Sequence, residues 1–114
     1  MIPSITLYRG TDLASANDIV SHGVDTRKAA RWNGSGEFWA TTNPTDADWH
    51  ANGHPNSPPA ARVEFTVPLS VFQALRQLAP PGFVFYNPAD YEFFPASFAV
   101  LNLYIAHGTV HVLP

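Results

Sequence analysis

The sequence contains no cysteine and few charged residues. The absence of cysteine excludes disulfide bonds, thiolate metal ligands and a cysteine nucleophile. Charged residues make up 13% of the chain and hydrophobic residues 46%, which is enough apolar material for a core and too little charge for a disordered chain. The formal net charge of −3 also argues against a surface that attracts nucleic acid, so nucleic acid is not an expected partner.

Long apolar runs are also absent. Met1 is followed by Ile-Pro-Ser, without the basic segment and apolar run of a signal peptide. No apolar stretch approaches the length of a membrane span, so no membrane association is expected. These features predict a cytoplasmic protein, or the catalytic domain of a larger delivered effector.

What the sequence does contain is a series of short strands and short helices. Its 114 residues fit one domain, and the order of the elements predicts a compact, largely antiparallel α+β domain over residues 1–114. The expected strands are Ile5–Tyr8, Glu37–Thr41, Arg62–Val67, Phe83–Tyr86 and Tyr91–Phe94, with a hairpin of Leu103–Ala106 and Thr109–Leu113. In Arg62–Val67 the apolar Val63, Phe65 and Val67 alternate with polar residues, which predicts a half-buried strand. The expected helices are Leu13–Val20, with Thr11 or Asp12 as the cap and Gly23 as the stop; Pro44–Asn52, with Asn43 as the cap; Ser70–Ala79; and one turn within Pro95–Asn102.

The first candidate site motif is Leu7–Thr11. Here Arg9 is expected to be the last residue of the first strand, and Gly10 follows it. A fixed cation beside accessible backbone suits a diphosphate or a ribose. The alternative is an ordinary surface arginine before a turn.

The second and third motifs lie farther along the chain. Gly34–Pro44 combines glycines, an aromatic pair and two threonines, which suits either a stacking ligand or a normally packed strand with a helix cap. Asp90 and Glu92 are two apart on an expected strand, so both carboxylates point to one face. One of them could stabilise a developing cation, or both could be solvated at a turn. His50 and His54 have metal-like spacing, but the intervening helix is broken, so no metal site is expected.

Taken in order, Leu7–Thr11, Phe38–Thr42 and Asp90–Glu92 resemble the three motifs of the ADP-ribosyltransferase superfamily. Its members share a split, mostly antiparallel β fold with a cleft that binds NAD. The family pattern is an arginine or histidine on the first strand, a Ser/Thr- or Tyr-containing second motif and a glutamate on a late strand. The helices at Ala16–Gly23 and after Asn43–Pro44 are also similar to those of small bacterial members. The resemblance covers most of the chain and implies two packed, mostly antiparallel sheets with a few short helices.

The resemblance also implies residue roles. Glu92 would bind the ribose 2′-hydroxyl and stabilise the oxocarbenium-like transition state, while Arg9 would hold the phosphate or ribose of NAD. Thr41 and Thr42 would brace the cleft and position the acid, and Trp39 would pack against the nicotinamide. The implied catalytic residues are Glu92, Arg9 and Thr41, and their side chains are expected to line one cleft between the two sheets. The implied NAD-binding residues are Arg9, Gly10, Thr11, Arg31, Phe38, Trp39, Thr41, Thr42 and Asp90.

The sequence departs from the family pattern in three places. Trp39 stands where many relatives have tyrosine, Ala40–Thr42 replaces Ser-Thr-Ser, and Asp90 replaces the first glutamate of a paired-acid version. The change at Asp90 bears on the choice of acceptor. The expected activity is transfer of ADP-ribose from NAD to an unidentified acceptor, and the expected partner is a protein acceptor or a cognate antitoxin or immunity protein.

Three alternatives stay open at this point. Arg31–Gly34 is similar to a related family of NAD-degrading bacterial toxins, for which water would be the acceptor. The same fold could instead be a non-catalytic module that binds a ligand or a protein. A nucleotide- or RNA-modifying relative would use the basic loop of Arg27, Lys28 and Arg31, but the net acidity makes this the least favoured reading.

Overall fold

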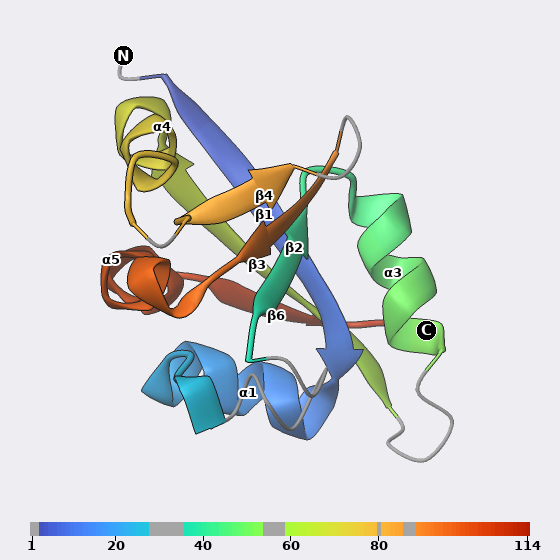
Figure 1. The fold of residues 1–114 in the computed structure, drawn as a ribbon. Helices are drawn as coiled ribbons and strands as arrows, with labels where there is room; N and C mark the ends of the chain where they lie inside the picture. The colour runs from blue at the N-terminus through green and yellow to red at the C-terminus, as the bar shows by residue number, and fades with distance from the viewer. Residues whose placement is uncertain (1–2, 28–35, 54–58, 80, 86–88) are drawn as a thin grey trace.

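The computed structural model describes residues 3–27, 36–53, 59–79, 81–85 and 89–114. The strands of these residues form one six-stranded antiparallel sheet with the order β4-β5-β2-β1-β3-β6 (Figure 1). In chain order the strands are β1 (Ser4–Asp12), β2 (Phe38–Thr41), β3 (Ala60–Pro68), β4 (Phe83–Phe85), β5 (Asp90–Phe93) and β6 (Thr109–Val112). The α+β class predicted from the sequence is therefore confirmed.

The described strands form a single sheet, so the prediction of two packed sheets is wrong for this part of the chain. The reason is that β1 pairs on both of its edges and joins the two halves. It is in register with β3 from Ser4 opposite Pro68 to Asp12 opposite Ala60. Its registered pair with β2 is Tyr8 opposite Thr41. The junction between β1 and β2 is thus much shorter than the ladder between β1 and β3.

Strand β1 is also longer than the predicted Ile5–Tyr8. It continues through Arg9 and Gly10 to Asp12 because β3 supplies a paired neighbour along its whole length. Arg9 consequently lies within the strand and not at its last residue. In β3 the predicted alternation is confirmed, since Val63, Phe65 and Val67 are buried and the residues between them are not.

Helices cover both faces of the sheet. Helices α1 (Leu13–His22), α4 (Leu69–Leu75) and α5 (Pro95–Ile105) pack on the face that carries the main core. Helix α3 (Pro44–Asn52) lies on the other side, where Ala47 and Ala51 approach the backbone of Gly10 (Figure 1). The buried core residues include Leu7, Ala16, Ile19, Phe38, Val63, Phe65, Val67, Phe72, Leu75, Phe93, Phe98, Leu101 and Ile105.

The helix starts and stops of the N-terminal half follow the predicted local signals. The carboxylate of Asp12 accepts the backbone N–H of Ser15 at 3.0 Å and caps α1. Gly23 ends that helix with a φ of 79°, which favours glycine. Asn43 caps α3, and Pro44 occupies its first turn. None of the helices in the described residues is long and apolar enough to cross a membrane.

The C-terminal elements differ from the predictions. Helix α5 has 11 residues and ends at Ile105, so the predicted strand Leu103–Ala106 and its hairpin are wrong. Phe98, Leu101 and Ile105 recur at helical spacing and are buried in the core, which stabilises helix over strand. The side chain of Asn102 fixes this helix to the segment after α1, accepting from the N–H of Val24 at 2.8 Å and donating to its carbonyl at 2.9 Å.

Strand β6 and helix α4 also differ from the predictions. Strand β6 forms as expected but pairs with β3 instead of with the preceding segment. Helix α4 ends at Leu75 and not at Ala79. Gly82 packs against the carbonyl of Leu75, so the chain must turn back at that point.

We expect Gly10→Ala to lower the free energy of unfolding by about 3 kcal/mol, because the added methyl group would overlap the backbone of α3 at Ala47. Gly53→Ala is the matched control. A Cβ at Gly53 would lie 3.4 Å from the carbonyl oxygen of His50 at an exposed position, so its effect should stay below about 0.5 kcal/mol. Urea denaturation of both variants measures the difference, and equal stabilities would contradict this packing.

We also expect the Asp12 cap to make stability depend on pH. Burial alone raises the pKa of Asp12, but hydrogen bonds from Ser15 and Thr11 outweigh it and hold the pKa below its ordinary value of 3.8. A depressed carboxylate pKa stabilises the fold above the unfolded pKa, and this stabilisation is lost as pH falls through the folded value. Asp12→Asn keeps an acceptor oxygen but does not titrate. Denaturation from about pH 7 down to about pH 3 should therefore show a wild-type advantage that is constant above about pH 5 and declines below about pH 4. A constant difference throughout would count against a titrating cap.

Candidate functional site

The structure brings the three sequence motifs onto neighbouring strands. Arg9 lies on β1, Trp39 and Thr41 lie on β2, and Asp90 and Glu92 lie on β5. Across β2 and β5, Thr41 is opposite Asp90 and Trp39 is opposite Glu92. Directly opposed residues of antiparallel strands share a face. Thr41, Trp39 and both carboxylates therefore project from one face of the sheet.

The side chain of Arg9 projects from the opposite face of the sheet. Tyr8 is opposite Thr41 and so shares its face, while Arg9 is the next residue along β1. Successive side chains of a strand alternate, which places Arg9 on the face of the buried Leu7. Arg9 and Glu92 consequently leave the sheet on opposite faces. The prediction that Arg9, Thr41 and Glu92 line one cleft is therefore wrong, because Arg9 projects from the other face.

The guanidinium of Arg9 nevertheless contacts β2. Its Nη1 donates to the carbonyl oxygen of Trp39 at 3.1 Å, and its Cζ lies 5.4 Å from the centroid of the Phe38 ring. This side-chain hydrogen bond links β1 to β2 beside the registered pair of Tyr8 and Thr41. Burial lowers the pKa of Arg9 to about 10, so the guanidinium is still charged at neutral pH.

Glu92 is a buried carboxylate, with only 4% of the residue exposed. It faces the same way as Trp39 on one neighbouring strand and Val84 on the other. Asp90, two residues earlier, is only partly buried. Glu92 is thus a shielded acid beside an aromatic ring, and Asp90 is a second, more accessible acid. Such an arrangement can stabilise positive charge on a reacting group.

The two threonines of the second motif act in the turn that starts α3. Thr41 is 5% exposed, and its Oγ1 accepts the backbone N–H of Asn43 at 3.1 Å. The hydroxyl of Thr42 donates to the carbonyl oxygen of Ala89 at 3.4 Å, and its backbone N–H donates to the same oxygen at 2.9 Å. These contacts fix the end of β2 against the start of β5 and so hold Asp90 in place.

The remaining predicted NAD-binding residues have structural surroundings. Phe38 belongs to the core, Gly10 lies against α3, and Thr11 is 2% exposed with its hydroxyl 3.4 Å from a carboxylate oxygen of Asp12. Arg31 lies outside the described residues. The three described positions, Phe38, Gly10 and Thr11, are therefore engaged in the core, against α3 and at the start of α1.

A pocket that sequence reasoning missed lies at another part of the sheet. Its volume is about 480 Å³, and it is bounded by the start of β1, by α4 and by the β4–β5 pair. None of the predicted site residues that the structure describes lines it. Tyr91 does, although it stands between Asp90 and Glu92, because alternation turns its ring to the opposite face. The dense aromatic residues of Phe83–Phe94 were the available signal in the sequence.

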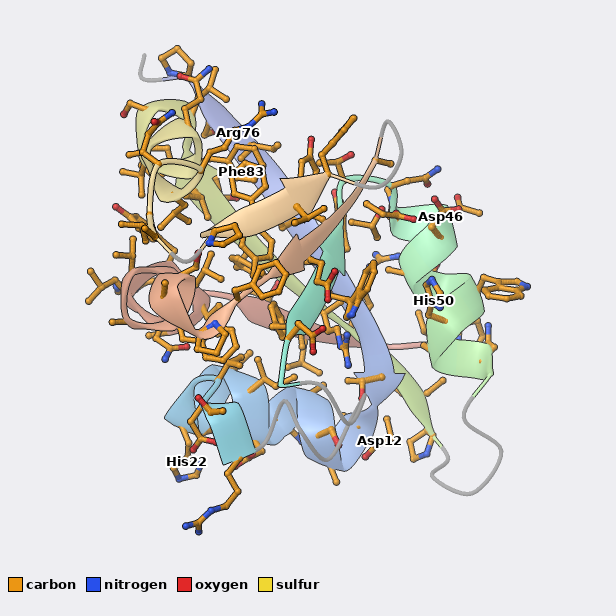
Figure 2. The ribbon with its side chains drawn as sticks, viewed as in Figure 1. Asp12, His22, Asp46, His50, Arg76 and Phe83 are labelled. Carbon is orange, nitrogen blue, oxygen red and sulfur yellow. The ribbon has the colours of Figure 1, made fainter. Side chains whose placement is uncertain are left out.

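Metal-ligating side chains do not gather in the described part of the chain. No group of three or more His, Asp or Glu residues there could hold a metal ion. Figure 2 shows His22 on α1 and His50 on α3, in separate parts of the molecule. His54 of the weak sequence pair lies outside the described residues. Comparison of the chain with protein-family models, curated proteins and solved structures finds no match.

We expect Thr41→Val to lower the free energy of unfolding by about 1–2 kcal/mol, because the N–H of Asn43 loses its acceptor at the start of α3. Thr41→Ser keeps the oxygen and is the control, with an expected loss nearer 0.5 kcal/mol. Thermal and urea denaturation provide the comparison. A valine variant that is as stable as the serine variant would show that this hydrogen bond contributes nothing.

Proposed function

We propose that this protein cleaves the nicotinamide–ribose bond of NAD and transfers ADP-ribose to an acceptor. The observation that carries the proposal is the shared face of Trp39, Thr41, Asp90 and Glu92 on the paired strands β2 and β5. This face combines an aromatic ring, a hydroxyl and two carboxylates. The order of the three motifs, which resembles ADP-ribosyltransferases, supports the same chemistry.

In this proposal the nicotinamide ring packs against Trp39 and the adjoining ribose lies at Glu92. The bond from ribose C1′ to the ring nitrogen breaks, and its electron pair stays with the departing nicotinamide. Positive charge then develops on the ribose, and the Glu92 carboxylate stabilises it. The acceptor forms a new bond to C1′, and Asp90 takes the proton that the acceptor loses. Nicotinamide is a good neutral leaving group, so charge stabilisation and positioning supply the catalysis.

Arg9 takes a different role from the one that the resemblance implies. Its side chain leaves the face of the sheet that is opposite to the face of Glu92. It donates a hydrogen bond to the backbone carbonyl of Trp39, which is the residue paired with Glu92 on the neighbouring strand. We therefore assign Arg9 as a positioning residue that fixes β2, instead of as a phosphate ligand. In an Arg9→Lys variant the hydrogen bond to the Trp39 carbonyl should be lost, because lysine lacks the planar fork of the guanidinium. Since Arg9 positions β2 and does not bind the substrate, steady-state kinetics should show a larger fall in kcat than rise in KM.

A non-catalytic binding module is the second candidate. The observation that favours it is that the hydroxyl groups of Thr41 and Thr42 both make hydrogen bonds to the backbone of the protein. Thr41 accepts one in the β2–α3 turn, and Thr42 donates one at the start of β5. Such a module would bind NAD without releasing nicotinamide. Hydrolysis, in which water takes the place of the acceptor, uses the same residues and is an outcome of the same assay.

The experiment that tests the proposed function is nicotinamide release from NAD, with Glu92→Gln as the variant. The amide keeps the size of the side chain and still accepts a hydrogen bond, so NAD affinity should stay within a few-fold. It removes the negative charge that the cationic transition state needs, so kcat should fall on the order of 100- to 1000-fold.

Glu64→Gln is the matched control for this test. Glu64 is opposite Tyr8 on β1, so it projects from the same face as Glu92 but on the far side of the β1–β2 junction. We expect its nicotinamide release to equal that of the wild type. A thermal-shift titration with NAD checks binding, because a ligand of the folded state raises the melting temperature. Absence of both binding and release in the wild type would overturn the proposal, and binding without release would favour the non-catalytic module.

A further inference from the structure

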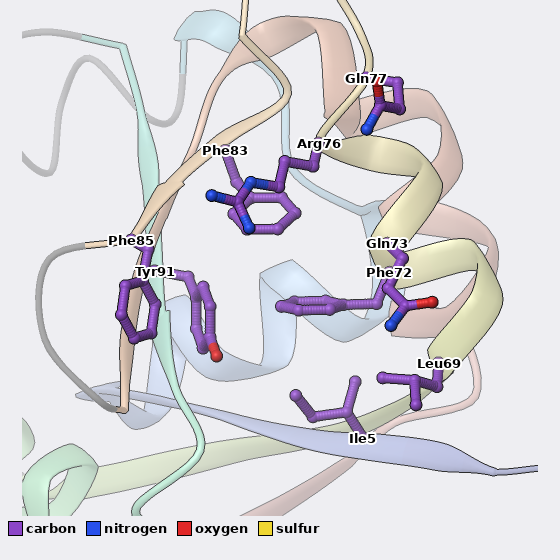
Figure 3. A pocket seen from close by; sticks show the side chains of 9 residues that line it. All are labelled: Ile5, Leu69, Phe72, Gln73, Arg76, Gln77, Phe83, Phe85 and Tyr91. Atoms are coloured by element: carbon purple, nitrogen blue, oxygen red, sulfur yellow. The ribbon is translucent and has the colours of Figure 1, made fainter.

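The pocket beside α4 has the size of a small-molecule site. Its volume is about 480 Å³, within the range of roughly 300–1,000 Å³ that is typical of ligand pockets. It is lined by Ile5, Leu69, Phe72, Gln73, Arg76, Gln77, Phe83, Phe85 and Tyr91 (Figure 3). Because Tyr91 turns away from the face of Asp90 and Glu92, this pocket is separate from the site of the proposed function.

The walls of the pocket are aromatic and hold one another in place. The rings of Phe72 and Tyr91 meet edge to face with centroids 4.9 Å apart. Phe72 also stacks on Phe83 at 4.7 Å, and Phe85 lies 5.3 Å from Tyr91 at a tilt. Such contacts favour the observed ring orientations and so support the shape of the pocket.

The two ends of the pocket differ in polarity. Ile5 and Leu69 form an apolar end, whereas Arg76 lies by Phe83 at the other end (Figure 3). Gln73 and Gln77 add amide groups along the α4 side. None of the described residues that line the pocket is acidic. Burial raises the pKa of Tyr91, and the positive charge of Arg76 opposes that shift.

Part of the aromatic wall is open to solvent. Phe85 is 50% exposed, and Ile5, Leu69 and Tyr91 are only partly buried. A flat ring inserted here would cover apolar surface that water now contacts. An anionic group on that ring would accept hydrogen bonds from the guanidinium of Arg76, which is better suited than an ammonium to a planar anion.

We propose that this pocket binds a small molecule in which a planar aromatic ring carries an anionic group, a carboxylate or a phosphate. The ring lies among Phe72, Phe85 and Tyr91, and the anion lies at Arg76. Gln73 and Gln77 line the same pocket and supply further donors to polar groups of the ligand.

Three probes test this assignment by protein-observed NMR titration or calorimetry. Naphthalene-1-carboxylate offers the ring with a carboxylate, adenosine monophosphate offers a ring with a phosphate, and naphthalene-1-methanol is the uncharged match of the first. We expect at least one anion to bind with a Kd below about 1 mM and about five-fold more tightly than the alcohol. Binding of the carboxylate alone or of the phosphate alone identifies the anion. Failure of both anions, or equal affinity for the alcohol, overturns the proposal.

Two exposed positions provide variants that should fold normally. Arg76→Gln should weaken the bound anion about five-fold and leave the alcohol unchanged, while Phe85→Ser should weaken all bound probes about five-fold. Arg27→Gln is the control, because Arg27 is exposed, lies outside the pocket and changes the net charge equally. Wild-type affinity in both pocket variants, or an equal loss in Arg27→Gln, would place the binding elsewhere.

Discussion

The junction between β1 and β2 is the constraint on which the rest of the structure depends. The registered pair of Tyr8 and Thr41 joins the half of the sheet with β4 and β5 to the half with β3 and β6. The Arg9 guanidinium reinforces this junction through the Trp39 carbonyl. Burying a guanidinium is costly, as its lowered pKa indicates, and a hydrogen bond together with contact over an aromatic ring offsets part of that cost. The charge therefore lies where the backbone ladder is shortest.

This junction also divides the chemistry between two faces. On one face, the short strands β2 and β5 hold Trp39, Asp90 and Glu92 at fixed spacing. Trp39 is directly opposite Glu92, and Asp90 lies two residues before Glu92 on the same strand. On the other face, the intervening Tyr91 contributes to an aromatic pocket with Phe72 and Phe85. A single stretch of β5 thus serves two surfaces. Any change in its register would exchange the acidic face for the aromatic one.

The packing of α3 sets the geometry of the candidate catalytic face. Helix α3 begins directly after β2, where the oxygens of Thr41 and Asn43 fix the turn. It then lies against Gly10, where no side chain intervenes. Both oxygens of Asp48 on this helix accept from Nη1 of Arg62 at 3.0 Å, and the Arg62 guanidinium lies over Tyr8. Close backbone approach and a two-oxygen ion pair together hold the helix beside the junction.

The sequence by itself determined the elements that depend on local signals. The Asn43 cap, the Gly23 stop and the alternation of Val63, Phe65 and Val67 are properties of neighbouring residues, so the sequence was enough to predict them. For the cap of α1 the sequence offered both Thr11 and Asp12, and the structure shows that Asp12 accepts the hydrogen bond. The order of the motifs likewise placed Arg9, Thr41 and Glu92 on strands. Only the tertiary structure decided that Arg9 and Glu92 leave opposite faces, because strand register depends on partners far along the chain. The same is true of α5, where burial of Leu101 and Ile105 against the sheet outweighed a local pattern typical of a hairpin. The pocket at Arg76 required the tertiary structure too, since its walls come from β1, α4, β4 and β5, which meet only after folding.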